Sequence, residues 1–211
     1  MFMADLPYII IGGGGHTRVL LGVLRLMGEQ VQGILTRDET IVGNTIMDAP
    51  VLGTDGKFAI EKGQFQLING VGNRASRQGS GLEIRAAATA RYEALGIHME
   101  SVIAPNANIM PEVKIHHGAQ VMAGVTIQPY AVIGAGSIVN TNALIDHDVT
   151  IGEHTHIAPG AILCGNVSVG GLTHIGAGAI ILQGLTIGHN CVIGAGVTIS
   201  KNVTDGAVVA Q

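Results

Sequence analysis

The chain has 211 residues, of which 32 are glycine and 47% are apolar, while only 12% are charged. This length suits one large domain or two small ones. The net charge of −4 argues against nucleic acid as the main partner, because few cations are available to neutralise phosphates. No apolar run approaches the roughly 20 residues that a spanning helix needs, and the N-terminus shows no signal-peptide pattern. The composition therefore predicts a cytoplasmic protein without membrane insertion.

Charged residues are distributed unevenly along the chain. Residues 1–100 contain nine of the eleven Lys and Arg residues and ten of the fifteen Asp and Glu residues. Residues 101–211 contain no Arg, but they contain seven of the nine His residues. This break predicts two domains, residues 1–100 and residues 101–211, with different architectures.

The first hundred residues read as a small α/β unit. The apolar run Tyr8–Ile11 predicts a strand, which is followed by four glycines and a helix-like apolar run to Met27. Further strands are expected at residues 31–35 and 66–71, and a helix is expected at residues 85–95. A full dinucleotide-binding domain needs more strands than this, so a mononucleotide or a nucleotide sugar fits the size better.

The glycine-rich turn after the first strand is a candidate phosphate site. A strand, a glycine-rich loop and a helix together place a phosphate at the helix N-terminus. The third glycine of the dinucleotide fingerprint is absent, because Thr17 stands in its place. The turn therefore predicts either nucleotide binding or a plain strand-to-helix connection. Asp38, after the second strand, could contact a ribose or a base, but its neighbours are equally typical of a solvated loop.

The second half of the chain repeats with a period of six residues. Seventeen positions spaced by six are all aliphatic, and the residues two positions before them are mostly small. The aliphatic positions are Ile103, Ile109, Ile115, Val121, Ile127, Ile133, Val139, Ile145, Ile151, Ile157, Leu163, Val169, Ile175, Ile181, Ile187, Ile193 and Ile199. Residues two apart point to the same side of an extended segment, whereas six residues rotate a helix face by about 600°. The pattern therefore predicts a β-solenoid whose aliphatic side chains form a continuous inner column.

This repeat resembles the hexapeptide-repeat, left-handed parallel β-helix family, in which three hexapeptides form one triangular coil of eighteen residues. Members of that family are typically trimeric acyltransferases that use acyl-CoA or acyl carrier protein. The resemblance implies an α/β N-terminal half-Rossmann-like domain followed by a left-handed parallel β-helix. Residues eighteen apart then stack directly, so that His156 should lie against His174, and His147 under Gly165.

Three stretches of the sequence point to one group within this family: I-I-I-G-G-G-G-H-T, V-G-N-R-A-S-R, and residues 138–167. Together with the solenoid they resemble the sialic-acid O-acetyltransferase and UDP-4-amino-sugar N-acetyltransferase family of the bacillosamine pathway. The resemblance implies an acetyltransferase that transfers acetyl directly from acetyl-CoA to a UDP-amino-sugar, as a homotrimer and without a metal. It also implies that the glycine-rich turn holds the UDP moiety through Gly13, Gly14, Gly15 and His16. Asp38 and Asn73 lie where the family has other nucleotide contacts.

The resemblance also implies the catalytic residues. His147 lies in a turn between Asp146 and Asp148, and it matches the family's catalytic base. Asp148 matches the acid that orients it, although that acid is more often Glu. A neutral imidazole can accept a proton near neutral pH, but a D-H-D turn is also ordinary surface sequence. His156 and Gly165 match positions near the acetyl thioester, with the Gly165 N–H facing the oxyanion.

Asn140 matches a polar group of the acceptor pocket. The remaining histidines of the second half, including His154 and His174, are expected at the surface.

Three other functions remain open from the sequence. The same base and thioester site would serve an O-acetyltransferase acting on sialic acid or a related sugar. A zinc carbonic anhydrase shares the solenoid but needs three His with metal spacing, which the sequence does not show. A non-catalytic scaffold or nucleotide-sugar sensor would not turn over acetyl-CoA.

Family members usually continue past an Asp-Gly pair with a Pro-containing segment that helps to bind CoA. Residues 207–211 contain no Pro, so either the sequence is truncated or that contact is reduced.

Overall fold

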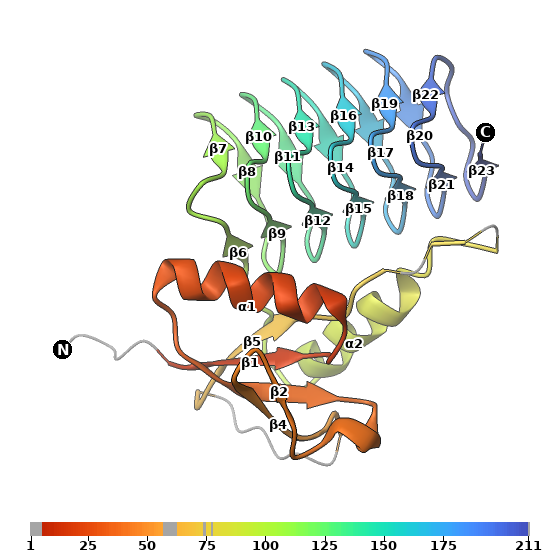
Figure 1. Cartoon of the computed structure of the whole chain (residues 1–211). Coiled ribbons are helices and arrows are strands. Elements are labelled where there is room, and N and C mark those ends of the chain that lie inside the picture. Colours follow the sequence, from red (N-terminus) through yellow and green to blue (C-terminus); the bar gives the residue numbers. More distant parts are fainter. Residues whose placement is uncertain (1–5, 57–62, 74, 77, 211) are drawn as a thin grey trace.

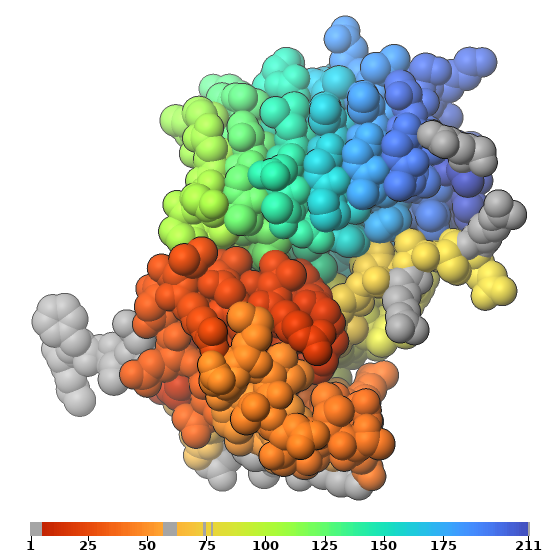
Figure 2. All heavy atoms as spheres, viewed as in Figure 1, coloured from red at the N-terminus to blue at the C-terminus, as the bar shows by residue number. Residues whose placement is uncertain are grey.

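The computed structural model describes residues 6–56, 63–73, 75, 76 and 78–210. It consists of an α/β unit followed by a parallel β-solenoid, and the two lie side by side (Figure 1). Figure 2 shows the N-terminal segments of the α/β unit, in red and orange, beneath the first coils of the solenoid. No helix in the described part of the chain is long and apolar enough to cross a membrane. The predicted α/β unit and parallel solenoid are confirmed.

The α/β unit contains a sheet whose described strands have the order β3-β4-β2-β1-β5. Strands β1, β2, β4 and β5 are parallel, and only β3 among the described strands pairs in the antiparallel sense. Its elements are β1 (Tyr8–Ile11), α1 (Gly15–Met27), β2 (Val31–Thr36), η1 (Glu39–Ile41), β3 (Thr45–Ile46), β4 (Ala49–Thr54), β5 (Gln66–Asn69) and α2 (Glu83–Glu93).

The two faces of this sheet are covered by different elements. Alternate residues of β1 point to opposite faces, because side chains alternate along a strand. Ile10 packs with Leu20 and Leu24 of α1, and Met122 of the solenoid joins the same cluster. Ile9 and Ile11 belong to a second cluster, which contains Tyr92 of α2. The solenoid therefore shares a core with the α1 face of the sheet.

The solenoid winds through three parallel sheets. The described residues form a seven-stranded sheet facing the α/β unit, here called the junction sheet, and two others of six and five strands. Strands in successive coils pair residues eighteen apart, as predicted. The junction sheet contains β6 (Val102–Ile103), β9 (Gln120–Val121), β12 (Ile138–Val139), β15 (His156–Ile157), β18 (His174–Ile175), β21 (Val192–Ile193) and β23 (Val208–Val209). The second sheet contains β7 (Asn108–Ile109), β10 (Thr126–Ile127), β13 (Leu144–Ile145), β16 (Ile162–Leu163), β19 (Ile180–Ile181) and β22 (Thr198–Ile199). The third sheet contains β8 (Lys114–Ile115), β11 (Val132–Ile133), β14 (Thr150–Ile151), β17 (Ser168–Val169) and β20 (Thr186–Ile187).

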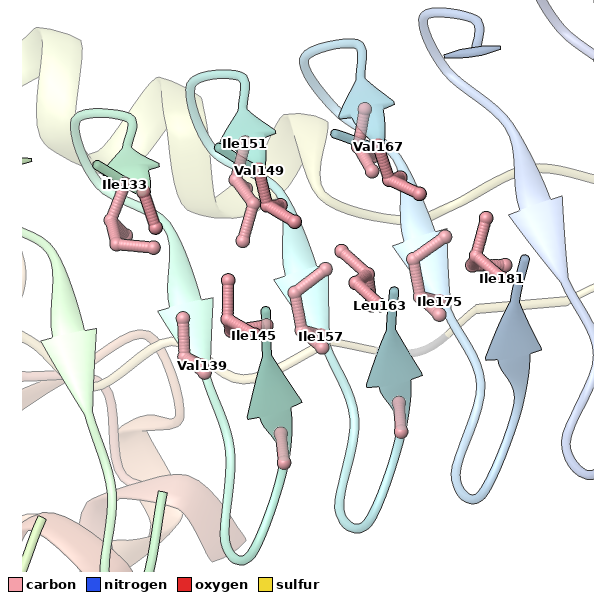
Figure 3. Packing of buried hydrophobic residues seen from close by; sticks show 14 of the residues in the cluster. Ile133, Val139, Ile145, Val149, Ile151, Ile157, Leu163, Val167, Ile175 and Ile181 are labelled. Atoms are coloured by element: carbon pink, nitrogen blue, oxygen red, sulfur yellow. The ribbon is translucent and has the colours of Figure 1, made fainter. Parts of the chain in front are cut away.

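The predicted aliphatic column fills the interior of the solenoid. Figure 3 shows Ile145, Ile157 and Leu163 among side chains that point inward from successive strands. Because the second residue of each strand points inward, the first residue points outward. Ile103 is an exception to the predicted burial, since it is 37% exposed in the first coil, which has no coil before it.

A ladder of buried hydroxyl groups runs along one inner edge. Ser137, Thr155 and Thr173 are fully buried at positions eighteen apart. Each hydroxyl group donates to a carbonyl oxygen of a turn, as Thr155 Oγ1 does to Gly170 O at 3.0 Å. Each also accepts from a backbone N–H one coil further along the chain. These small residues therefore satisfy backbone groups that would otherwise be buried without partners.

Several element boundaries differ from the sequence predictions. Strand β4 was not predicted, because Pro50 and Gly53 interrupt its apolar residues. The third predicted strand ends at Asn69 rather than at residue 71, and α2 begins two residues earlier than predicted. In the last coil, β23 pairs with residues sixteen positions earlier, so the period of eighteen stops there.

Candidate active site

The turn between β1 and α1 contains glycines for two separate reasons. At Gly12, φ is 113° and a Cβ atom would lie 2.9 Å from the Val71 backbone nitrogen, so a larger residue does not fit. A Cβ atom on Gly13 would lie equally close to a neighbouring side chain. At Gly14 and Gly15, by contrast, a Cβ atom would meet nothing within 4 Å. The fold needs Gly12, and Gly13 lies close to the side chain of Ile41, whereas Gly14 and Gly15 leave the start of α1 open.

Helix α1 starts at this open turn without a capping side chain. Its N-cap is Gly14, and its first turn contains no acidic residue. The first N–H groups of a helix lack intrahelical partners and carry the positive end of the helix dipole. Gly14, Gly15 and His16 line a cavity, so these N–H groups are available to an anion.

Two adjoining cavities lie at the carboxyl ends of the strands. The first, here called the strand-end cavity, has a volume of about 350 Å³, and its lining includes Gly13, Thr36, Arg37, Asp38, Ile41 and Asp55. The second, the junction cavity, has a volume of about 590 Å³, and its lining includes Gly15, His16, Val19, Asn73, Asn140 and His156. Gly14, Val71, Gly72 and Ile84 line both, so the two cavities share a wall.

The junction cavity brings together residues from both halves of the chain. Asn140 Nδ2 lies 3.1 Å from His156 Nε2, within the solenoid. Asn73, from the α/β unit, places its amide nitrogen 3.3 Å from His156 Nδ1 and 2.7 Å from His174 Nδ1. His156 and His174 stack one coil apart with ring centroids 5.1 Å apart, as their spacing predicts. Asn73 therefore links the glycine-rich unit to the outer face of the junction sheet.

The hydrogen bonds around His156 determine which nitrogen of its neutral ring carries the proton. Asn140 Oδ1 accepts from the Thr141 N–H at 2.8 Å, so its Nδ2 donates to His156 Nε2. The proton of the neutral ring is then on Nδ1, which faces the Asn73 amide. Asn73 Oδ1 is buried without a partner, and a half-turn of the amide places it against this N–H.

The partly buried imidazoles of the junction, His16, His156 and His174, are neutral at pH 7. Burial lowers the pKa of His156 to about 3, and the neighbouring His174 adds to that shift. Burial also lowers the pKa values of His16 and His174 to about 4. His16 Nε2 is held 2.6 Å from Gln120 Oε1. The cavity wall therefore gains no positive charge from these rings.

His147 lies in the exposed turn between β13 and β14, at the corner where the second and third sheets meet, whereas His156 lies on the junction sheet. Its Nδ1 lies 2.8 Å from Asp148 Oδ2. This hydrogen bond raises the pKa of His147, and the charge of Asp146 raises it further. A Cβ atom on Gly165 would lie 2.6 Å from His147 Nε2, so the ring lies directly over the glycine. The predicted stacking of His147 and Gly165 is confirmed, but neither residue lines the junction cavity of its own chain.

Asp38 and Gly13 line the strand-end cavity rather than the junction cavity. Asp38 Oδ1 accepts from the backbone N–H of Thr40 at 3.0 Å and from its hydroxyl group at 2.5 Å. These bonds lower the pKa of Asp38, the hydroxyl contact having the larger effect. The carboxylate is thus ionised at the edge of the cavity.

The sequence placed some residues of the site wrongly. His174 was expected at the surface, but the structure partly buries it under Asn73. His154 is also partly buried, and burial lowers its pKa. Asn73 of the α/β unit covers His174, a contact that no local pattern signals, whereas His154 lies against Gly136 of the preceding coil. Arg74 and Arg77 of the V-G-N-R-A-S-R stretch lie outside the described residues. Over the described residues, no group of three or more His, Cys, Asp and Glu side chains is arranged to hold a metal ion.

Known proteins share this architecture. The family model described as bacterial transferase hexapeptide (six repeats) matches residues 100–135 and 130–165. Comparison with curated proteins gives no match. Perosamine N-acetyltransferase from Caulobacter crescentus, solved as a variant with CoA and GDP-perosamine, is 31% identical with a TM-score of 0.88. The match covers 99% of this chain and 95% of that protein.

Two further solved structures are similar. The acetyltransferase domain of PglB from Neisseria gonorrhoeae, in complex with acetyl coenzyme A, is 33% identical with a TM-score of 0.87. That match covers 99% of this chain and 97% of the domain. WeeI from Acinetobacter baumannii has a TM-score of 0.85 over 98% of this chain and 97% of its own, but its 22% identity supports the fold alone. The chain therefore belongs to the hexapeptide-repeat transferases and is an acetyltransferase of the group that includes perosamine N-acetyltransferase and PglB.

Proposed function

We propose that the protein transfers the acetyl group of acetyl-CoA to the amino group of a UDP-linked 4-amino-4,6-dideoxy sugar. The observation that carries this proposal is the pair of adjoining cavities. A nucleoside fits the strand-end cavity beside Asp38, and a diphosphate fits the open start of α1 at Gly14 and Gly15. The sugar then lies in the junction cavity near Asn140 and His156. The similar perosamine enzyme, which binds a nucleotide-linked amino sugar, supports this class of acceptor.

Acetyl-CoA is assigned to a groove beside the same histidines. A cavity of about 410 Å³ follows the later coils, and its lining includes Ser76, Ala158, His174, Gly176, Ala177, Gly194 and Ala195. Its small side chains leave room for an extended chain along the solenoid axis. Because His174 contacts Asn73, a thioester at this end of the groove would lie close to the acceptor. The PglB domain, which was solved with acetyl coenzyme A, supports this cosubstrate.

His147 is assigned as the general base. The amino nitrogen attacks the thioester carbonyl carbon, and His147 Nε2 accepts the proton that the nitrogen loses. Asp148 holds the other ring nitrogen and stabilises the imidazolium. The Gly165 N–H has no acceptor among the described residues and is assigned to the developing oxyanion. The tetrahedral intermediate then collapses, the C–S bond breaks, and CoA leaves as the thiol with that proton.

This assignment requires more than one copy of the chain. His147 and Gly165 lie at the corner between the second and third sheets, away from the junction sheet that carries His156, so the base and Gly165 at one junction cavity come from a neighbouring copy. The outward residues Leu144, Ile162 and Ile180 form a partly exposed apolar row on the second sheet, next to the His147 turn. Burying such a row against another copy is favourable. We therefore propose a homotrimer with active sites between solenoids.

Release of free CoA thiol tests the proposed reaction. Acetyl-CoA is supplied with UDP-4-amino-4,6-dideoxy-N-acetylglucosamine, with GDP-perosamine or with sialic acid, and the thiol is measured colorimetrically. Binding of acetyl-CoA and of the nucleotide is measured separately by calorimetry. Release of thiol that depends on either amino sugar supports N-acetylation. The amino sugar that gives the faster release shows whether the enzyme prefers UDP or GDP as the nucleotide of its acceptor. Release only with sialic acid would instead indicate the O-acetyltransferase alternative. Binding of acetyl-CoA or nucleotide without any release would indicate a scaffold or a sensor.

The open position at Gly14 provides a test of the diphosphate site. Gly14→Ala is expected to leave the fold intact, because a Cβ atom there meets nothing within 4 Å. The added methyl group occupies the space that a phosphate needs, so KM for the nucleotide sugar should rise by about 10-fold, equivalent to about 1.4 kcal/mol. The matched control is Gly22→Ala in the same helix, which also has room for a Cβ atom. The control should keep KM and raise the free energy of unfolding by about 0.5–1 kcal/mol. An unchanged KM in Gly14→Ala would exclude this diphosphate position.

Asp148 provides a test of the base through the pH profile. Only the neutral ring of His147 accepts a proton, so kcat/KM should rise with pH through the pKa of His147, which lies above its ordinary value. Asp148→Asn removes the largest cause of the raised pKa of His147. The rise of kcat/KM with pH should therefore occur at lower pH, while kcat falls. Asn tolerates the positive φ of 60° at this position, which keeps the turn intact. If the rise of kcat/KM stays at the same pH in Asp148→Asn, a group other than His147 controls it.

A further inference from the structure

A fully buried arginine lies behind the shared wall of the two cavities. Arg85, in α2, is 0% exposed and donates three hydrogen bonds to carbonyl oxygens. Its Nη1 donates to Asn69 O at 2.7 Å and to Val71 O at 2.9 Å. Its Nε donates to Gly136 O of the solenoid at 3.1 Å. One guanidinium group thus fixes the loop after β5 to the solenoid.

The charge of Arg85 has no counter-ion among the described residues. Its Nη2 is buried without a hydrogen-bond partner, and burial lowers the pKa of the guanidinium to about 9. A group with that pKa is still charged at pH 7. A buried cation without a paired anion is costly to the fold. The three carbonyl groups stabilise its donors but do not neutralise it.

The surroundings of Arg85 indicate where the missing negative charge belongs. The loop that it holds supplies Val71 and Gly72 to both cavities. Its charge also reaches His16 and His156, whose pKa values it helps to lower, so it acts on the walls of the junction cavity. Because these rings are neutral, they neither compete for an anion nor repel Arg85. The open N-terminus of α1 faces the same space.

We infer that Arg85 is a positioning residue for the acceptor, which holds the shared cavity wall against the solenoid and supplies the buried positive charge that the substrate's diphosphate completes. This inference rests on the proposed function, since it takes the acceptor to be a nucleoside diphosphate sugar. Arg85 is fully buried and touches neither the acetyl group nor the base. Its effect should therefore depend on the phosphates of the nucleotide at the N-terminus of α1, and not on those of CoA in the separate groove along the solenoid.

Binding measurements with and without phosphates test this role. UDP and CoA are titrated calorimetrically, and uridine by NMR, into wild type and Arg85→Met. We expect Arg85→Met to weaken UDP binding by about 10-fold or more and uridine binding by less than about 3-fold. CoA binding should stay within about 2-fold, as should UDP binding to the control Arg25→Met, which removes an exposed arginine of α1. Equal losses for UDP and uridine would overturn the inference and leave Arg85 a structural role only.

A second variant covers the case in which Arg85→Met does not fold. Arg85→Lys keeps the charge but loses the planar group that reaches three carbonyl oxygens. It should keep the wild-type ratio of UDP to uridine affinity within about 3-fold, even if both affinities fall. If the ratio of UDP affinity to uridine affinity falls in Arg85→Lys as it does in Arg85→Met, the positive charge of Arg85 has no role in binding the diphosphate. Failure of the wild-type protein to bind UDP or GDP would instead overturn the proposed acceptor, which separates the two failures.

Discussion

Replacing His147 by alanine is expected to lower kcat by about 100-fold or more, the usual contribution of a general base. The variant should keep its fold and its affinity for acetyl-CoA, because the His147 side chain is exposed and contacts mainly Asp148. Steady-state kinetics with saturating acetyl-CoA and nucleotide sugar measure the effect. The loss should fall on kcat rather than on KM, since the proton is transferred only as the reaction proceeds.

The matched control for this variant is His116→Ala, which removes another exposed histidine of the solenoid. His116 lies in an earlier coil, and its side chain lines neither the junction cavity nor the groove beside His174 to which acetyl-CoA is assigned. Its removal should leave kcat within about 2-fold of wild type, as is usual for an exposed residue outside the site. Activity of His147→Ala at the level of this control would remove His147 from the mechanism.

The second large effect is expected at Gly165. Its backbone conformation accepts alanine, but the new Cβ atom would lie 2.6 Å from His147 Nε2 and 2.7 Å from Cε1. The imidazole must move away, and a displacement of about 1 Å at a catalytic group can cost about 100-fold in rate. Gly165→Ala should therefore lower kcat by that order, with a circular dichroism spectrum and a Tm close to those of wild type.

A double-mutant cycle distinguishes this steric effect from other causes. In the His147→Ala background the methyl group at Gly165 has no ring to displace, so the second substitution should cost less than about 3-fold. The Gly165 N–H is present in every variant, so its assigned contact with the oxyanion does not enter the cycle. Additive losses would mean that the methyl group blocks the thioester rather than the base.

The period-six repeat was sufficient to predict the solenoid. Each aliphatic residue at that spacing is the inward residue of a strand, and pairing eighteen apart follows from three strands per coil. The same spacing predicted that His156 stacks on His174 and that His147 lies beneath Gly165. Contacts between coils of a solenoid can be predicted from sequence, because every residue contacts the next coil at a fixed separation along the chain.

The contacts between the two halves could not be predicted in the same way. Asn73 reaches His174 across 101 positions of sequence, and Arg85 reaches Gly136 across 51. No period relates these residues, so the sequence left His174 at the surface and gave Arg85 no role. The roles of the individual glycines in the glycine-rich turn could not be predicted from the sequence either. Its composition indicated a phosphate site, but only the structure separates Gly12 and Gly13, which pack against neighbours, from the open Gly14 and Gly15.

In the proposed trimer, His147 of one chain serves the acceptor cavity of another. Co-expression of His147→Ala with Gly14→Leu, under two affinity tags, yields mixed oligomers from two defective chains. A site formed by the cavity of the first and the base of the second has both intact parts. Random mixing in a symmetric ring places roughly one quarter of the sites in that state, so activity should recover to about that fraction of wild type. Mixed oligomers no more active than their parents would contradict the claim and place the base and the cavity within one chain.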